Sequence, residues 1–267
     1  MQPGGLDQTP AHRGGPQRGQ GQRLAVVTGA GRGFGAVLAR ELSAAGWLVL
    51  AVVRQASRAP ALDGLPALDG LPGLDSLPAL DGLPGVQVVI HDVRSGDMSA
   101  VVDAVRGRPV DVLINNAAQG AAHQRLGGVD AAGVLNAVDV NAAGPLRMVQ
   151  ALLPQLLSSA DPVIVNITSR LGSVSAQARG DFAGLSTSYA YRVSKAAQNM
   201  VTVSLAQDLQ GRVRCWAVHP GKLATGMGQA DAVKPPRVAA RELLELLESN
   251  ERRSPRFVSL GAPDLDW

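Results

Sequence analysis

The feature that most restricts the fold of this chain is a glycine-rich turn between an apolar run and an amphipathic segment. The apolar run covers residues 24–28, and the turn reads Gly29-Ala30-Gly31-Arg32-Gly33-Phe34-Gly35. After it, apolar residues recur at helical spacing as far as about Gly46. Strand, glycine turn and helix in this order are typical of a dinucleotide-binding unit, whose glycines let the backbone approach a pyrophosphate. The spacing Gly-x-x-x-Gly-x-Gly differs from the usual Gly-x-Gly-x-x-Gly, so the pattern alone is a weak signal.

Apolar runs that fit buried strands alternate with segments of helical period along the rest of the chain. The predicted strands are 47–53, 86–91, 110–114, 163–168, 213–218 and an edge strand at 256–259; helices are predicted at 98–105, 134–157, 196–209 and 238–247. This alternation predicts an α/β fold, a single doubly wound parallel-sheet (Rossmann) domain. Ligands of such sheets bind at the carboxyl ends of the strands. Five candidate residues fall at predicted strand ends: Gly29, Asp92, Asn115, Ser169 and Pro220.

Composition narrows the class of protein. The 267 residues are enough to bury one full core, and 46% hydrophobic with 18% charged residues fits a globular domain. Three Phe, two Tyr and three Trp leave few rings to stack on bases, and the net charge is only +3, so no nucleic-acid partner is expected. The lone Cys215 excludes an internal disulfide. No apolar run approaches the roughly 20 residues of a membrane span, and no signal-peptide core is evident, so a cytoplasmic enzyme without a membrane partner is expected.

Two segments fall outside the alternating pattern. Residues 1–22 are rich in Gly, Gln, Pro and Arg without periodicity, which predicts a disordered tail and leaves 23–267 as the domain. Residues 61–84 repeat a hexapeptide four times, as in Ala-Leu-Asp-Gly-Leu-Pro. A proline every sixth residue forbids a long helix, while a polyproline II course and serial turns both remain open. The repeat is therefore predicted to be a surface insertion.

Tyr191 and Lys195 suggest the chemistry. Side chains four residues apart share one face of a helix. A free tyrosine has a pKa of about 10, and a nearby ammonium lowers it, which makes the phenol a usable general acid or base. A surface lysine beside a half-buried tyrosine is the other interpretation, and the surrounding motifs decide between the two.

The end of the second strand bears on the choice of cofactor. It reaches Arg54 about 20 residues after the glycine turn, where an NAD enzyme usually carries an acid for the ribose 2′-hydroxyl. No Asp or Glu occurs between Glu41 and Asp63. Arg54 together with Arg32 suits a 2′-phosphate, which predicts NADPH over NADH; two merely solvated arginines are the alternative.

In this order and context, the motifs resemble the short-chain dehydrogenase/reductase family over about residues 23–267, apart from the repeat. The matching pieces are Thr28 to Gly35, Asn115-Asn116-Ala117-Ala118, Asn141, Ser169, Tyr191 to Lys195, Pro220-Gly221 and Thr225. Within the family, Tyr189 to Lys195, His219-Pro220-Gly221 and Gly261 to Trp267 look like the C-factor/sniffer-type carbonyl reductases.

The resemblance implies hydride transfer between NADP and a small carbonyl or alcohol substrate, with a role for each residue of the motifs. Tyr191 would give its proton to the carbonyl oxygen. Lys195 would lower the pKa of Tyr191 and hold the nicotinamide ribose. Ser169 would bind the substrate oxygen; its alternative role is a cap at the end of the strand. Asn141 would anchor a water of a proton relay; its alternative role is that of a polar residue inside a helix that bonds to neighbouring backbone.

The implied cofactor contacts include Asp92 at the adenine and Thr225 at the pyrophosphate, and no metal ligand is among the candidates. The full cofactor-binding set is Gly29, Arg32, Gly33, Phe34, Gly35, Arg54, Asp92, Val93, Asn115, Ala117, Tyr191, Lys195, Pro220, Gly221, Leu223 and Thr225.

The resemblance leaves assembly and substrate open. Relatives commonly pair through the helices that hold Asn141 and Tyr191, so a homodimer is expected, although the long segment between Ser169 and Tyr191 could block that surface. The same segment, with Lys222 where an aromatic is frequent, alters the substrate rim. A serine hydrolase is set aside because residues 184–188 lack the second glycine of a nucleophile elbow. A non-catalytic dinucleotide-binding sensor or scaffold remains the alternative function.

Overall fold

The computed structural model describes residues 21–54, 80, 82–120, 126–185, 187–224 and 232–267. These residues form a seven-stranded sheet whose neighbouring strands are all parallel, in the order β3-β2-β1-β4-β5-β6-β7. The strands are β1 (Leu24–Thr28), β2 (Leu48–Val53), β3 (Val86–Ile90), β4 (Val112–Asn115), β5 (Val163–Ile167), β6 (Arg214–His219) and β7 (Arg256–Ser259). The predicted α/β doubly wound fold is confirmed. The strand order reverses beside β1, which places a ligand crevice outside the carboxyl ends of β1 and β4.

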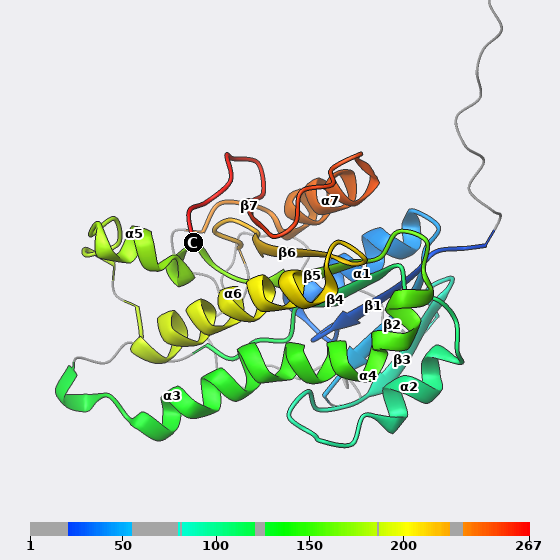
Figure 1. Cartoon of the computed structure of the whole chain (residues 1–267), viewed down its shortest axis with the longest axis horizontal. Coiled ribbons are helices and arrows are strands. Elements are labelled where there is room, and N and C mark those ends of the chain that lie inside the picture. The colour runs from blue at the N-terminus through cyan, green and yellow to red at the C-terminus, as the bar shows by residue number, and fades with distance from the viewer. Residues whose placement is uncertain (1–20, 55–79, 81, 121–125, 186, 225–231) are drawn as a thin grey trace, which may run out of the picture.

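Helices cover both faces of the sheet (Figure 1). They are α1 (Gly33–Ala44), α2 (Ser99–Val105), α3 (Ala131–Val138), α4 (Gly144–Ser158), α5 (Val174–Ala178), α6 (Tyr189–Leu209) and α7 (Pro236–Glu248), with the short turns η1 (Leu126–Gly128), η2 (Asp139–Ala143) and η3 (Arg170–Gly172). No helix in the described part of the chain is long and apolar enough to cross a bilayer.

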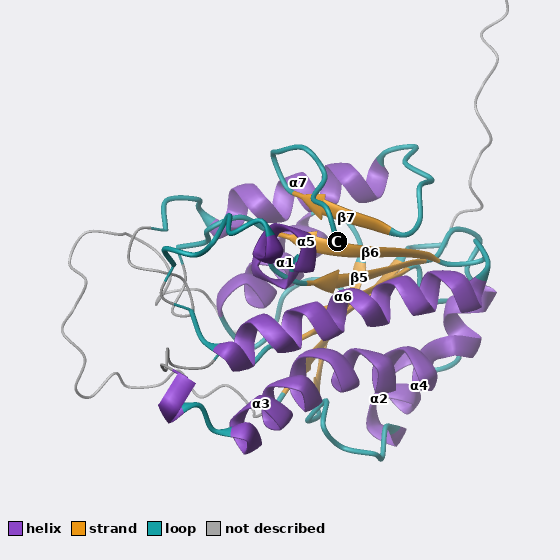
Figure 2. Ribbon diagram, turned by 60° about the vertical axis from the view of Figure 1, so that its left-hand side comes forward, coloured by secondary structure: helices purple, strands orange, loops and turns teal. Residues whose placement is uncertain are grey.

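Successive side chains of each strand point to opposite faces of the sheet, so the apolar strands contribute side chains to two separate cores, one on each face. On one face, Ala25 and Val27 pack with α1 and α7. On the other, Leu24 and Val26 pack with α2, α4 and α6. Figure 2 shows these helices as two layers with the sheet between them. The rigid sheet holds the loops at its carboxyl edge, where the candidate residues lie.

The helix predicted at 134–157 differs from the prediction at its start and in its middle. It begins at Ala131, because Asp130 caps it by accepting hydrogen bonds from the N–H groups of Ala132 and Gly133. A π-helical turn, η2, then separates α3 from α4 and contains Asn141. Such turns are inserted single residues within a helix and often mark functional positions. Apolar periodicity cannot reveal one inserted residue, so the interruption was not predicted.

The last copy of the hexapeptide repeat departs from the predicted surface insertion. Leu80 is buried in the core beside α1, and Leu83 packs against the same cluster. The Ser43 hydroxyl also donates to the carbonyl of Pro84 over 2.7 Å. The end of the repeat is therefore part of the domain. Residues 61–79 and 81 of the repeat lie outside the described residues, as do residues 1–20 of the predicted tail.

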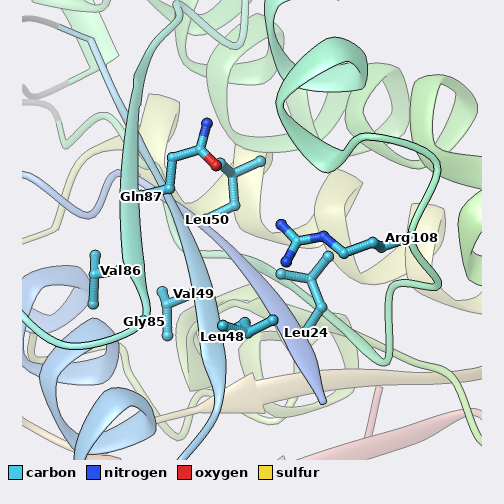
Figure 3. A pocket seen from close by; sticks show the side chains of 8 residues that line it. All are labelled: Leu24, Leu48, Val49, Leu50, Gly85, Val86, Gln87 and Arg108. Carbon is cyan, nitrogen blue, oxygen red and sulfur yellow. The ribbon is translucent and has the colours of Figure 1, made fainter. Parts of the chain in front are cut away.

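A pocket opens at the amino ends of β1, β2 and β3 (Figure 3). It is lined by apolar side chains such as Leu24 and Leu48, with Gln87 and Arg108 as its polar members. The candidate residues lie at the opposite, carboxyl ends of the strands. This pocket is therefore separate from the candidate active site.

Candidate active site

The glycine turn after β1 is clamped against the end of β4. Gly29 has φ +64°, and a Cβ there would lie 2.7 Å from the Cα of Ala117, so only glycine fits. The Nδ2 of Asn116 donates to the carbonyls of Thr28 at 3.0 Å and Gly29 at 3.2 Å. The Thr28 hydroxyl accepts the N–H groups of Asn116 and Ala117, both at 3.0 Å. Asn116 therefore shapes the turn, a role that its place beside Asn115 did not reveal.

The start of α1 fits a bound phosphate group. Arg32 occupies the cap position without a side-chain cap, and the first turn carries no acidic residue. A Cβ at Gly33 would meet nothing within 4 Å, so the backbone there faces open space. Uncapped N–H groups at a helix N-terminus attract anions. The side chain of Phe34 is buried in the core, and a Cβ at Gly35 would clash with the Gly29 carbonyl, so both could contact a cofactor only through the backbone.

At the end of β3, Asp92 is held by an arginine that sequence reasoning did not single out. The Asp92 carboxylate accepts from Arg94 Nε at 3.1 Å and Nη2 at 2.7 Å. This bonding lowers the pKa of Asp92 to about 2, and the charge of Arg54 adds to the effect. Arg54 itself is exposed at the end of β2. Val93 is buried against Gly144, where a Cβ would lie 3.0 Å from Val93 Cγ2.

Asn115 turns its side chain away from the strand ends. Its Nδ2 donates to Asn166 Oδ1 over 2.9 Å, and Asn166 Nδ2 donates to Thr202 Oγ1 over 2.8 Å. These side chains form a buried polar layer between the sheet and α6. Ala117 already uses its N–H in the glycine turn. Ala117 could therefore meet an adenosine only through its other atoms, whereas Asn115 keeps a buried Oδ1 without a partner in the described part of the chain.

The structure brings Ser169 and Tyr191 together from separate elements. Ser169 caps η3 by accepting the N–H of Leu171 at 3.2 Å, and Ser188 caps α6 by accepting the N–H of Tyr191 at 3.1 Å. A Cβ at Gly172 would lie 2.7 Å from the carbonyl oxygen of Lys195, so η3 packs directly on the backbone of α6. The Ser169 hydroxyl lies close enough to the Tyr191 phenol to favour its phenolate.

The pKa of Tyr191 moves in the direction opposite to the one expected from the sequence. Burial raises it above the ordinary value of 10.0, because the phenolate would lose its hydration; the nearby Ser169 hydroxyl works against this. The lysine does not lower it in this arrangement, since the ammonium lies 5.8 Å from the centroid of the phenol ring and bonds elsewhere. Tyr191 is thus held as the neutral acid.

Lys195 is only 1% exposed. Its Nζ donates to the Ile167 carbonyl and to Gln198 Oε1, both at 2.8 Å. Burial lowers the pKa of Lys195 to about 7. Gln198 is fully buried, and its Nε2 finds no partner in the described part of the chain. A glutamine three residues after a lysine on the sheet-facing side of a helix is the signal that could have identified this contact.

Asn141 joins two elements with every polar atom of its side chain. Its Oδ1 accepts the N–H of Gln119 at 2.7 Å, while its Nδ2 donates to the Gln119 carbonyl at 3.0 Å and to Ser194 Oγ at 2.9 Å. The side chain thus ties the loop after β4 to α6, as expected for a buried polar residue that bonds to nearby backbone. An amide oxygen accepts two hydrogen bonds, so Oδ1 keeps one position for the expected water.

The loop after β6 places the last candidates. Pro220 is buried, and Gly221 has φ +95°, with Lys234 Cδ 2.8 Å from where its Cβ would lie. Leu223 is buried in the core and pairs by a backbone bridge with Lys234. Thr225 lies outside the described residues. The backbone of Gly221 is packed against the side chain of Lys234.

Comparison with known proteins agrees with this geometry. Residues 79–235 match the family profile described as short chain dehydrogenase. C-signal from Myxococcus xanthus is 38% identical over 173 residues, which are 64% of this chain and 100% of that protein. The NADPH-bound carbonyl reductase from chicken fatty liver superposes with a TM-score of 0.74 at 23% identity, covering 92% of this chain and 99% of that chain. The carbonyl reductase Sniffer of D. melanogaster gives 0.74 at 22% identity, with the same two coverages of 92% and 99%.

The profile match spans more than half of the chain, and it includes the strands and helices that carry Asn141, Ser169, Tyr191 and Lys195. The chain therefore belongs to the short-chain dehydrogenase family and is an oxidoreductase of that family. The likeness to the two carbonyl reductase structures, at their low identity, establishes a shared fold.

Proposed function

We propose that this chain reduces a carbonyl compound with NADPH and can run the reverse oxidation of the alcohol. The observation that carries this proposal is the gathering of Ser169, Tyr191 and Lys195 at the carboxyl edge of the sheet, where the Ser169 hydroxyl acts on the Tyr191 phenol and the Lys195 ammonium lies 5.8 Å from its ring. A bound nicotinamide supplies the hydride. The protein supplies a place for the carbonyl oxygen and a proton for the alkoxide that develops there.

The two hydroxyl groups divide this work. Ser169 donates a hydrogen bond to the substrate oxygen, which stabilises the negative charge that grows on it. Tyr191 gives its phenolic proton to the same oxygen, and the raised pKa keeps that proton on the phenol until it is needed. Lys195 holds the ribose hydroxyls of the cofactor, for which its ammonium must leave Gln198 Oε1. Its charge then favours the phenolate that proton transfer leaves behind.

The dinucleotide lies along the crevice beside β1 in this proposal. The backbone N–H groups at the start of α1, where Gly33 faces open space, would hold the pyrophosphate. Arg54 and Arg32, both exposed at that edge, bind a ribose 2′-phosphate. The acid at the end of β3 does not oppose such a phosphate strongly, because the charge of Asp92 is matched by Arg94. The NADPH in the chicken carbonyl reductase structure supports this choice of cofactor.

One observation favours a second function, a dinucleotide-binding sensor or scaffold without turnover. Lys195 is bonded to Gln198 and Ile167 rather than turned toward Tyr191. A chain in which this arrangement persisted would bind cofactor without catalysis.

A single experiment separates the two functions. Purified protein is mixed with NADPH and a panel of aldehydes and ketones, and loss of the reduced-nicotinamide absorbance is followed; NADPH binding is measured separately by fluorescence. The proposal predicts binding and turnover of at least one panel member. Binding without turnover of any member supports the sensor, and absence of binding contradicts both functions.

A further inference from the structure

Arg170 directly follows Ser169, so its backbone is fixed relative to the candidate catalytic pair. It is the first residue of η3, which Ser169 caps and which Gly172 holds against the backbone of Lys195. Adjacent Cα atoms lie about 3.8 Å apart. The side chain of Arg170 therefore starts directly beside Ser169.

The guanidinium of Arg170 is held in place without using its hydrogen-bond donors. Its Cζ lies over the ring of Phe182, 5.3 Å from the centroid. No hydrogen bond or ion pair joins this guanidinium to any residue that the structure describes. A cation stacked on a ring keeps its five N–H groups free, because they point outward in the guanidinium plane. The Arg170 guanidinium is thus held in place, and its N–H donors have no acceptor among the described residues.

The charged groups around Arg170 leave its positive charge unbalanced. His219, at the end of β6, is neutral at pH 7, since burial and then the charges of Arg170 and Lys234 lower its pKa to about 4. Lys234 is itself paired with Glu242. The nearby carboxylate of Asp181 is bound by Arg179.

A second arginine follows the other catalytic candidate. Arg192, directly after Tyr191, donates to the Thr187 hydroxyl, to Gln177 Oε1 at 3.3 Å and to the Leu185 carbonyl at 3.2 Å. All three acceptors are neutral, so they hold the segment before α6 without cancelling the charge. Arg192 therefore adds a second positive charge that no carboxylate among its hydrogen-bond partners balances.

We propose that Arg170 binds an anionic group of the substrate, so that the preferred substrates are carbonyl compounds carrying a carboxylate or a similar anion. This rests on the proposed function, because it assigns a substrate class to the same site. A guanidinium recognises a carboxylate through two parallel charge-assisted hydrogen bonds, which also orient the molecule that carries it. Orientation by Arg170 would present the carbonyl to Ser169 and Tyr191 from a fixed side.

The test uses benzoate and benzamide, which have the same shape and differ in charge, as calorimetric probes of the NADPH-loaded protein at pH 7.5. We expect benzoate to bind the wild type at least about tenfold more tightly than benzamide, as a charge-assisted pair at a partly exposed site allows. Arg170→Met should remove this difference, and Arg170→Lys should keep part of it. Arg179→Met, which removes a rim arginine already paired with Asp181 and Asp266, is the matched control and should leave the difference unchanged.

Turnover is measured in parallel with 4-carboxybenzaldehyde and its neutral methyl ester. The inference predicts a kcat/KM at least about tenfold higher for the acid, lost in Arg170→Met but not in Arg179→Met. Equal binding of benzoate and benzamide by the wild type, or an undiminished preference in Arg170→Met, overturns the inference. Selective benzoate binding without reduction of either aldehyde leaves the inference standing and counts against the proposed function instead.

Discussion

Replacing Lys195 by methionine should stabilise the protein most at low pH. Burial lowers the pKa of this lysine from 10.5 to about 7. Below pH 7 the ammonium is charged in both the folded and the unfolded chain, so the folded state bears the whole cost of burying it. Between pH 7 and 10.5 only the unfolded chain keeps the proton, so the free energy of unfolding of the wild type rises with pH. Above pH 10.5 both states are neutral and the cost has vanished.

The size of the effect follows from the two pKa values. Their difference, at about 1.4 kcal/mol per pH unit, corresponds to roughly 5 kcal/mol of destabilisation at pH 6 and below. At pH 9 the same relation leaves roughly 2 kcal/mol. The gain in stability from Lys195→Met should therefore shrink by roughly 2–3 kcal/mol between pH 6 and pH 9. The lost bonds to Ile167 and Gln198 shift the gain by a constant and do not change this slope.

Urea unfolding at pH 6, 7, 8 and 9, followed by circular dichroism, measures the stability difference between wild type and Lys195→Met. Tyr191→Phe is the matched control. Because the pKa of Tyr191 is raised above 10.0, this group does not titrate in the range, and the variant should run parallel to the wild type. If the difference in the free energy of unfolding between wild type and Lys195→Met stays constant from pH 6 to pH 9, burial does not lower the pKa of Lys195 as described.

Three further predictions test cofactor choice, the repeat and assembly. Arg54→Asp should shift the ratio of kcat/KM for NADPH over NADH toward NADH by about a hundredfold, since it replaces a phosphate contact by repulsion; an unchanged ratio means that this residue does not read the phosphate. Replacing residues 61–78 by a short Gly/Ser bridge should move the melting temperature by only a few degrees, whereas Leu80→Ala should cost about 2–4 kcal/mol because it opens a cavity in the core. A deletion that destabilises the protein more than Leu80→Ala would contradict the view that only the last copy of the repeat belongs to the core. Sedimentation should give the mass of a dimer paired through the helical segments that hold Asn141 and Tyr191, η2 and α6, where α6 exposes Tyr189, Val193 and Met200; the mass of one chain would exclude it.

The fold was predictable because its signals are local. Each strand is a short apolar run and each long helix an apolar period, so strand β1 was predicted with the bounds that it has and α7 within two residues at each end. The nearness of Ser169 to Tyr191 was expected only from the family resemblance, because no local pattern links the end of a strand to the start of a helix further along the chain.

The partners of buried polar groups were not predictable. The Lys195 ammonium donates to a carbonyl 28 residues away and to Gln198. The side-chain amide of Asn141 is hydrogen-bonded to Gln119 and Ser194. These contacts depend on how elements pack, which hydrophobic periodicity does not encode. The burial of Leu80 was missed for the same reason, since a repeated unit looks alike in sequence whether it faces the core or not.

The most direct test of the proposed mechanism compares Tyr191→Phe with Tyr189→Phe. Both variants lose one phenolic oxygen from the start of α6, but the Tyr191 phenol lies beside the Ser169 hydroxyl whereas Tyr189 is 47% exposed. NADPH oxidation with the best substrate of the carbonyl panel and NADPH binding by fluorescence are measured for each. The account predicts that Tyr191→Phe loses turnover by about a hundredfold or more with cofactor affinity unchanged, while Tyr189→Phe matches the wild type. Retained turnover in Tyr191→Phe would contradict the assignment of the proton donor.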